Sequence, residues 1–178
     1  RPERAIVQLK RMLRWDDAVD PRTSPLSLLQ YAVLMNSLIC VKAILANLEQ
    51  SMRIGCIERQ EFRRRIDSEV KRAPVVFDQV LYVLKSGVTT HLASSYASVD
   101  IFSALLDAGA STERRCTHGV QSLQCAAVLK RHEILRVWLE RFPNYDVDIP
   151  DETNITPLHA CLLRGGREGL METVKILL

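Results

Sequence analysis

The chain has 178 residues, of which 47% are hydrophobic and 25% charged, and its formal net charge is +3. This length and composition allow a continuous buried core, and a single elongated domain is sufficient to account for them. Residues 1–14 are too highly charged for a secretory leader.

Residues 23–41 carry no charged side chain, and the run is nearly long enough to suggest a membrane span. Proline and polar residues interrupt it, however, at Pro25, Gln30 and Asn36. We therefore predict no membrane span and expect two short buried helices that meet near Asn36 and Ser37.

The first predicted elements are helices arranged in pairs. Residues 1–23 are expected to contain the second helix of one pair and the hairpin that follows it. Residues 24–47 are expected to form a complete pair, with a first helix opening at 27–32 and a second at 39–46. An alternative register opens this unit at Ser24, but the first helix then lacks a small residue, so we prefer the later start.

Residues 48–87 occupy more chain than one such pair needs, so we predict a degenerate, expanded unit or insertion there. Phe62, Ile66 and Val70 are spaced four apart, which places them on one face of a predicted helix. A further apolar helix is expected over the residues that precede Gly87.

The expanded unit is also basic. Residues 51–73 contain seven Lys or Arg and four Asp or Glu residues, which makes the local charge +3. Interleaved acids favour a solvated helix face. An acidic protein partner is an alternative interpretation. Nucleic acid or an anionic surface is a weaker one, because Phe62 is the sole aromatic residue within the cluster.

Two further helix pairs are predicted at 88–120 and 121–155. In the first pair, Gly109 follows the second helix at a position that favours a left-handed residue. In the second pair, Ala126 and Ala127 occupy the positions of small residues, and an apolar stripe follows them.

The last unit, residues 156–178, opens with Thr156, Pro157, Leu158 and His159. The Thr156 hydroxyl can cap the coming helix, and Pro157 suits the first helical turn because no amide hydrogen is needed there. Equivalent frames start at Val88, Gln121 and Thr156, at spacings of 33 and 35 residues.

This motif and its spacing resemble the ankyrin-repeat family, whose units are about 33 residues long. The resemblance implies an all-α fold: an ankyrin-repeat solenoid of stacked antiparallel helix pairs with short β-hairpin loops. It also implies that His91, Gln124 and His159 occupy equivalent inner positions and hydrogen-bond backbone groups that link neighbouring units. Asn154 takes the place of the family's usual turn glycine.

On this interpretation the chain is one ankyrin-repeat domain, with residues 1–23 and 156–178 as partial repeats, and we expect it to be a fragment of a longer protein. Extra residues around Gly165 and Gly166 predict a longer turn between the two helices of the last unit.

The resemblance further implies a non-enzymatic protein–protein interaction module that binds another protein on a concave face, built from first helices, and on its hairpin tips. The side chains expected to bind the partner are Arg114, Arg115, Thr117, His118, Val120, Leu129, Lys130, Glu152, Thr153, Ile155 and Arg164. Alternatively, the chain is the regulatory ankyrin domain of a larger enzyme or ion channel. Binding of nucleic acid or an anionic surface through the basic insertion is less favoured.

No catalytic residue, metal site, cofactor or small-molecule substrate is expected. Arg136 stands where a zinc-protease helix needs its second histidine after His132. Cys116 and His118 would supply at most two metal ligands, and the acidic run 145–152 lacks the glycine that a calcium loop requires. Five cysteines without CxxC spacing favour reduced thiols and an intracellular location, in cytoplasm or nucleus.

Overall fold

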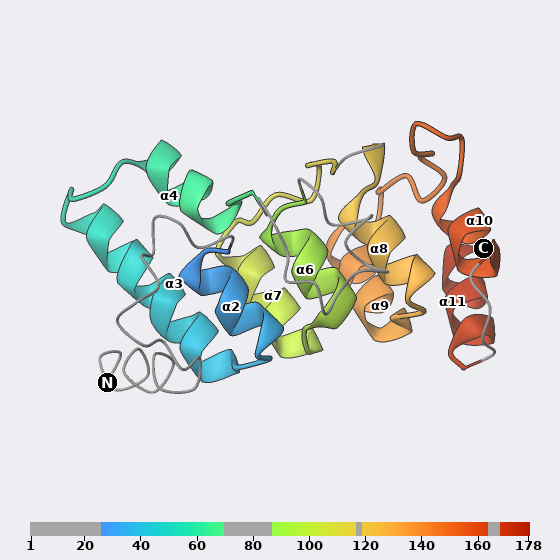
Figure 1. Cartoon of the computed structure of the whole chain (residues 1–178), viewed down its shortest axis with the longest axis horizontal. Helices are drawn as coiled ribbons and strands as arrows, with labels where there is room; N and C mark the ends of the chain where they lie inside the picture. The colour runs from blue at the N-terminus through green and yellow to red at the C-terminus, as the bar shows by residue number, and fades with distance from the viewer. Residues whose placement is uncertain (1–25, 70–86, 117–118, 164–167) are drawn as a thin grey trace.

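The computed structural model describes residues 26–69, 87–116, 119–163 and 168–178 (Figure 1). These residues form nine α-helices: α2 Leu28–Leu34, α3 Leu38–Arg53, α4 Arg59–Ile66, α6 Thr89–Tyr96, α7 Val99–Asp107, α8 Ser122–Val128, α9 His132–Arg141, α10 Pro157–Leu163 and α11 Leu170–Leu177. The all-α prediction is therefore confirmed for the described part of the chain. The predicted partial unit 1–23, Val70 and the helix predicted before Gly87 lie outside it.

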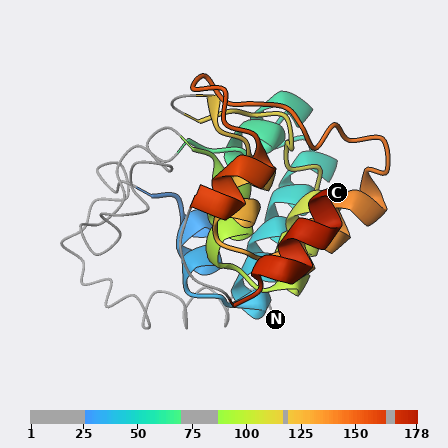
Figure 2. The same ribbon diagram turned by 90° about the vertical axis from the view of Figure 1, so that its right-hand side faces the viewer.

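The helices are arranged in two layers (Figures 1 and 2). The first helices of the pairs, α2, α6, α8 and α10, lie side by side in one layer, and α3, α7, α9 and α11 lie side by side in the other. Each first helix also packs against the second helix of its own pair, while α4 packs against α3. The buried apolar side chains therefore form one core between the layers.

The loops between units differ from the predicted hairpins. In the described residues, β pairing is limited to two isolated antiparallel bridges, Glu69 with Val88 and Arg115 with Gln121. Gln121 is also the N-cap of α8, so the chain becomes helical before a second pair of strand residues can form. In the loop that ends at Gln121, a single bridge therefore takes the place of the expected β-hairpin.

The second helix of the first complete pair is longer than predicted. It was expected at 39–46, but α3 continues to Arg53. Leu48 is buried and Met52 packs against the core, and both extend the apolar stripe that begins at Val41. The helix therefore crosses the residue at which the expanded unit was expected to begin.

Polar side chains tie three of the described first helices, α2, α6 and α8, to the loop of the following unit. The His91 Nε2 atom lies 3.1 Å from the Val120 carbonyl oxygen, to which it donates, and Nδ1 accepts from the Val88 amide at 3.3 Å. Gln124 Nε2 donates to the Ile155 carbonyl at 3.0 Å. The predicted inner positions of His91 and Gln124 are therefore confirmed.

Gln30 occupies the same position in α2. Its Nε2 donates to the Ser68 carbonyl at 2.6 Å, and its Oε1 accepts from the Ser27 amide at 2.9 Å. Ser27 in turn accepts a hydrogen bond from the Gln30 amide, which completes a capping box at the start of α2. This geometry supports the preferred register of the first complete unit.

His159 was expected to be buried in the same way, but the structure contradicts this. Its side chain is exposed and its Nδ1 atom lies 2.9 Å from the Thr156 hydroxyl. His91 and Gln124 each bind a carbonyl of a following unit, whereas no described loop covers α10 in the equivalent place. The hydroxyl of Thr156 also accepts from the His159 amide, as expected for a helix cap.

The turn that follows the first helix α6 is hydrogen-bonded to neighbouring units as well. Arg131 donates to the Ser95 carbonyl at 3.0 Å and to the Ala97 carbonyl at 2.5 Å. On the other side of the same turn, the Ser98 amide donates to Asn36 Oδ1 at 2.7 Å. The turn between α6 and α7 is therefore held from both neighbouring units.

Aromatic packing fixes the second layer. Trp138 is fully buried, and its ring stacks on Phe102 with centroids 5.6 Å apart. Phe142 and Tyr145 meet the Trp138 ring edge-on, at 6.2 and 5.4 Å. The Tyr145 hydroxyl then donates to Gln121 Oε1 at 2.7 Å, which links the loop after α9 to the start of α8.

We predict that His91 makes stability depend on pH. Burial lowers the pKa of His91 to about 4, even though the hydrogen bond to Val120 favours the charged form. Between about pH 6.5 and 4 the unfolded chain therefore binds a proton that the folded chain does not, and the free energy of unfolding falls as pH falls, by about 3 kcal/mol in total.

The matched control is His91→Gln, because Gln30 makes the same pair of hydrogen bonds without titrating. Urea unfolding at several pH values measures the effect, and the variant is expected to lose this part of the pH dependence. An unchanged pH dependence in His91→Gln would contradict the assignment.

A second prediction concerns Gly109, which ends α7 with a φ of 83°. The Gly109 amide donates to Leu106 O and the Ala110 amide to Leu105 O, which together form a Schellman motif. A Cβ at this position would meet no heavy atom within 4 Å, so the penalty arises from the backbone alone. Thermal unfolding should show a loss of about 1–3 kcal/mol for Gly109→Val.

Gly109→Asn is the control, because Asn36 and Asn154 already adopt positive φ in this chain. Its loss of stability should be clearly smaller. Equal melting of Gly109→Val and the parent would mean that the left-handed turn is not required.

Candidate protein-interaction surface

Two loops lie along one edge of the helix stack: the described residues 108–116 and 119–121 between α7 and α8, and residues 142–156 between α9 and α10 (Figure 1). We call these two loops together the loop edge. Both loops contain the same turn: the Cys116 amide donates to Val120 O at 2.9 Å, and the Asp151 amide donates to Ile155 O at 3.0 Å. Each carbonyl also accepts the inner side chain described above.

Left-handed residues occupy equivalent places in these turns. Gly119 has a φ of 74° and Asn154 a φ of 61°, so Asn154 takes the turn position that sequence reasoning assigned to it. A Cβ on Gly119 would lie 3.0 Å from Glu152 Cγ, which shows that the two loops touch. The loop edge is therefore a continuous surface.

The carboxylate of Asp151 is used inside its loop. Its Oδ1 atom accepts from the Thr153 amide and hydroxyl and from the Ile155 amide, and its Oδ2 atom accepts from Gln124. Burial favours the neutral form, but these hydrogen bonds outweigh it and hold the pKa of Asp151 below its ordinary value. Asp151 therefore stabilises the loop edge.

Several predicted binding residues lie on this surface. Arg114, Glu152 and Thr153 are exposed, and Val120 and Ile155 are half-buried between them. Three other predicted residues, Thr117, His118 and Arg164, lie outside the described residues.

Arg115 is exposed but engaged. Its Nη1 atom donates to the carbonyls of Gly119 and Pro150, each at 3.4 Å. The side chain therefore bridges the two loops, a structural role that the sequence did not indicate.

Leu129 and Lys130 lie elsewhere than predicted. They were expected to extend the binding patch as helix positions, but α8 ends at Val128, and both residues are in the turn that follows it. Gly169 packs against this turn, since a Cβ there would lie 3.0 Å from Lys130 O. The seven residues of α8, about 10 Å of helix, separate Leu129 and Lys130 from the loop edge.

The first helices were expected to supply exposed side chains to a concave face. In α6, residues 89–95 are all buried, and in α8, residues 122–127 are all buried. The central first helices therefore offer no exposed side chain, and the described loops carry the accessible part of the predicted surface.

A groove not foreseen from the sequence lies between α4 and the loop that follows α7. It encloses about 720 Å³, and Arg63 and Asp67 line it from α4 while Arg114 lines it from the loop. Asp67 Oδ1 accepts from the Ser111 amide at 2.8 Å. Burial raises the pKa of Asp67, while that hydrogen bond and the charges of Arg114 and Arg63 oppose the rise.

In the part of the chain that the structure describes, no three His, Cys, Asp or Glu side chains are grouped so as to hold a metal ion. No helix there has the length and apolar character needed to cross a membrane.

No protein-family model matches the chain. The chain is similar to a bovine protein named "Ankyrin repeat, SAM and basic leucine zipper domain-containing protein 1", with 26% identity over 125 residues. The similarity is thus to an ankyrin-repeat-containing protein. The matched region is 70% of this chain but 23% of the bovine protein, so the chain spans less than a quarter of that relative.

The contacts of Arg115 lead to a stability prediction. Arg115→Ala should lower the free energy of unfolding by up to about 1 kcal/mol, because two loop carbonyls lose an exposed donor. Arg114→Ala should change it by less than about 0.5 kcal/mol, since Arg114 is exposed and makes no hydrogen bond with another described residue. Denaturant unfolding of both variants checks this, and equal losses would show that Arg115 does not bridge the loops.

Proposed function

We propose that this chain is an ankyrin-repeat solenoid that acts as a non-enzymatic protein–protein interaction module. The observation that carries the proposal is the recurrence of one polar contact. Gln30, His91 and Gln124 each donate to a carbonyl in the loop of the following unit. Similarity to a bovine ankyrin-repeat-containing protein supports the same conclusion. Stacked repeats of this kind present extended surfaces to other chains.

The loop edge is the proposed binding surface. Glu152 and Thr153 are exposed and Val120 and Ile155 are half-buried, so the loop edge offers both polar and apolar side chains to a partner. The turns beneath them are closed by backbone hydrogen bonds, so these side chains are held in place before a partner binds.

A second candidate is a regulatory ankyrin domain within a larger enzyme or channel. Coverage favours the first part of this candidate, a domain within a longer chain: the matched region is 23% of a bovine protein whose name joins ankyrin repeats to other domains. On either proposal the location is intracellular, in cytoplasm or nucleus. The burial of Cys40, Cys125 and Cys161 inside helices suits reduced thiols.

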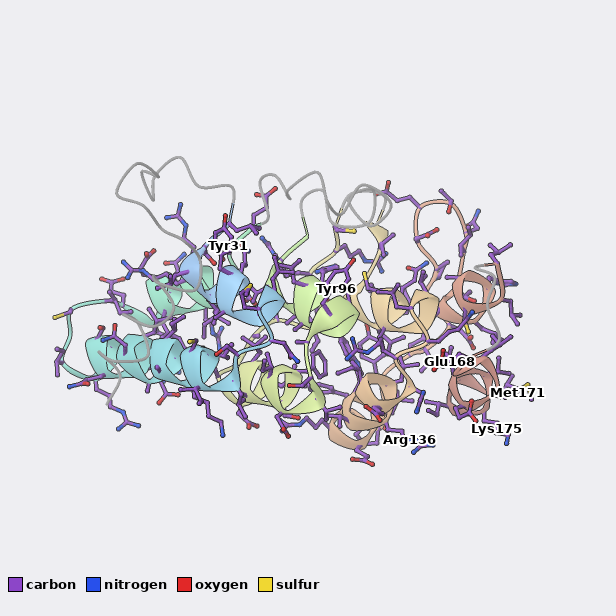
Figure 3. The ribbon with its side chains drawn as sticks, turned by 60° about the horizontal axis from the view of Figure 1, so that its bottom comes forward. Tyr31, Tyr96, Arg136, Glu168, Met171 and Lys175 are labelled. Carbon is purple, nitrogen blue, oxygen red and sulfur yellow. The ribbon has the colours of Figure 1, made fainter. Side chains whose placement is uncertain are left out.

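Affinity capture tests the module proposal. The chain and its Glu152→Arg, Thr153→Arg variant are immobilised, and proteins retained from a cell extract are compared by mass spectrometry. Arg136→Glu on α9 is the control, because Figure 3 shows that residue on the second-helix layer, away from the loops.

We expect a protein that the parent and the control both retain and that the loop variant loses. Circular dichroism of all three chains verifies that the loop variant is folded. If every protein retained by the parent is retained equally by the loop variant, the loop edge is not the binding surface and the proposal fails.

A further inference from the structure

The groove between α4 and the loop after α7 is built from segments that are far apart in sequence. Phe62 and Ile66 are buried, which holds α4 against the helix stack. Arg63 comes four positions after Arg59, so both side chains stand on one side of α4. Beside the groove, both arginines also line a smaller hollow of about 330 Å³ at the end of α7.

The opposite wall of the groove is held rigidly by Ser111. The Ser111 amide donates to Asp67 of α4, and the Ser111 carbonyl accepts from the Thr90 hydroxyl of α6 at 3.0 Å. Ser122 of α8 donates to the same Thr90 hydroxyl at 3.1 Å. Arg114 therefore projects from a loop whose backbone is tied to α6 and to the C-cap of α4, which lowers the entropy cost of binding through it.

Asp67 and Glu113 are the acidic side chains that line the groove, and two further acidic side chains near it are paired with arginines. Asp107 pairs with Arg141 at 2.6 Å, and Glu61 pairs with Arg65 at 2.8 Å. Asp67 is bound to the Ser111 amide.

Three guanidinium groups in this region have no such partner. Within the described residues Arg59, Arg63 and Arg114 make no hydrogen bond or ion pair, and Arg63 and Arg114 act on Asp67 only through space. Arg63 and Arg114 line the groove from its two walls, together with Arg64, against the two carboxylates of Asp67 and Glu113, whereas Arg59 lines the neighbouring hollow.

The chemistry of these groups fits carboxylates. A guanidinium donates two parallel hydrogen bonds to a carboxylate, and arginines on facing walls can each hold one. Asp67 and Glu113 also line the groove, so any anionic ligand has to place its charges at the arginines and away from these two carboxylates. Phe142 is the sole aromatic residue among its lining, so successive bases have no stacking platform.

We propose that this groove binds a glutamate- or aspartate-rich segment of a protein partner. The inference rests on the proposed interaction function and adds the chemical class of the partner. It also places the contact on Arg63 and Arg114, apart from the Glu152 and Thr153 side of the loop edge.

Fluorescence anisotropy with the purified chain and a fluorescein-labelled oligoglutamate peptide tests the proposal. The parent should bind the peptide, and Arg63→Glu, Arg114→Glu should weaken binding by at least about tenfold, or about 1.4 kcal/mol. The matched control is the double variant Arg136→Glu, Lys175→Glu, which makes the same change in net charge on α9 and α11. Both residues are labelled in Figure 3. The control should bind as the parent does.

The remaining outcomes overturn the inference. Absence of binding by the parent, or equal loss in both double variants, would show that no specific acidic site exists. Stronger binding of a labelled oligouridylate of equal length would assign the groove to nucleic acid instead.

The two proposals fail separately. If a captured protein depends on Glu152 and Thr153 while oligoglutamate does not bind, the groove inference fails and the interaction module stands. If the peptide binds through Arg63 and Arg114 but no protein is captured through the loop edge, the proposed loop surface fails.

Discussion

The hydrogen bond from an inner side chain to the carbonyl of the next loop is the contact on which the arrangement of units depends. It recurs at Gln30, His91 and Gln124, in three successive first helices of the described chain. Each bond fixes one loop relative to the preceding helix and satisfies a backbone carbonyl that would otherwise be costly to bury. Because loop and helix are held together, small residues such as Ala93 and Ala126 suffice for close packing of the first layer.

The same hydrogen bonds hold the surface loops in place. The loop turns close through backbone hydrogen bonds next to the carbonyls that the inner side chains bind, so exposed loop residues stand on a rigid base. On the other side, Ser111 joins its loop to α4 and α6. The loop edge and the groove between α4 and the loop after α7 are therefore both consequences of how neighbouring units are joined.

Local motifs allowed much of this fold to be predicted. The helix start near Ser27, the cap at Thr156 and the left-handed Gly109 each follow from a few adjacent residues, and these predictions agree with the structure. The length of α3 was missed because its apolar stripe continues through the charged residues after Ala46. The exposure of His159 was missed because burial there depends on a neighbouring unit and not on the motif itself.

The candidate surface was less predictable, for a physical reason. Arg63 and Arg114 were each noted in a basic or exposed context, but their meeting across a groove depends on how α4 packs, which no local pattern encodes. Conversely, Leu129 and Lys130 were expected to extend the binding patch as helix positions, but α8 ends at Val128 and both residues lie in the turn that follows it. A site formed by side chains that are distant in sequence can be recognised only from the three-dimensional structure, whereas caps and turns can be recognised from adjacent residues.

The stacked layers also bear on how the chain reaches its native state. The bonds that join successive units connect residues 29 to 38 positions apart, from His91 and Val120 to Gln30 and Ser68. Closing a segment of that size costs little more entropy than closing a shorter one, and no contact between distant units has to form first. Native structure can thus start at any adjacent pair of units and spread along the array in either direction.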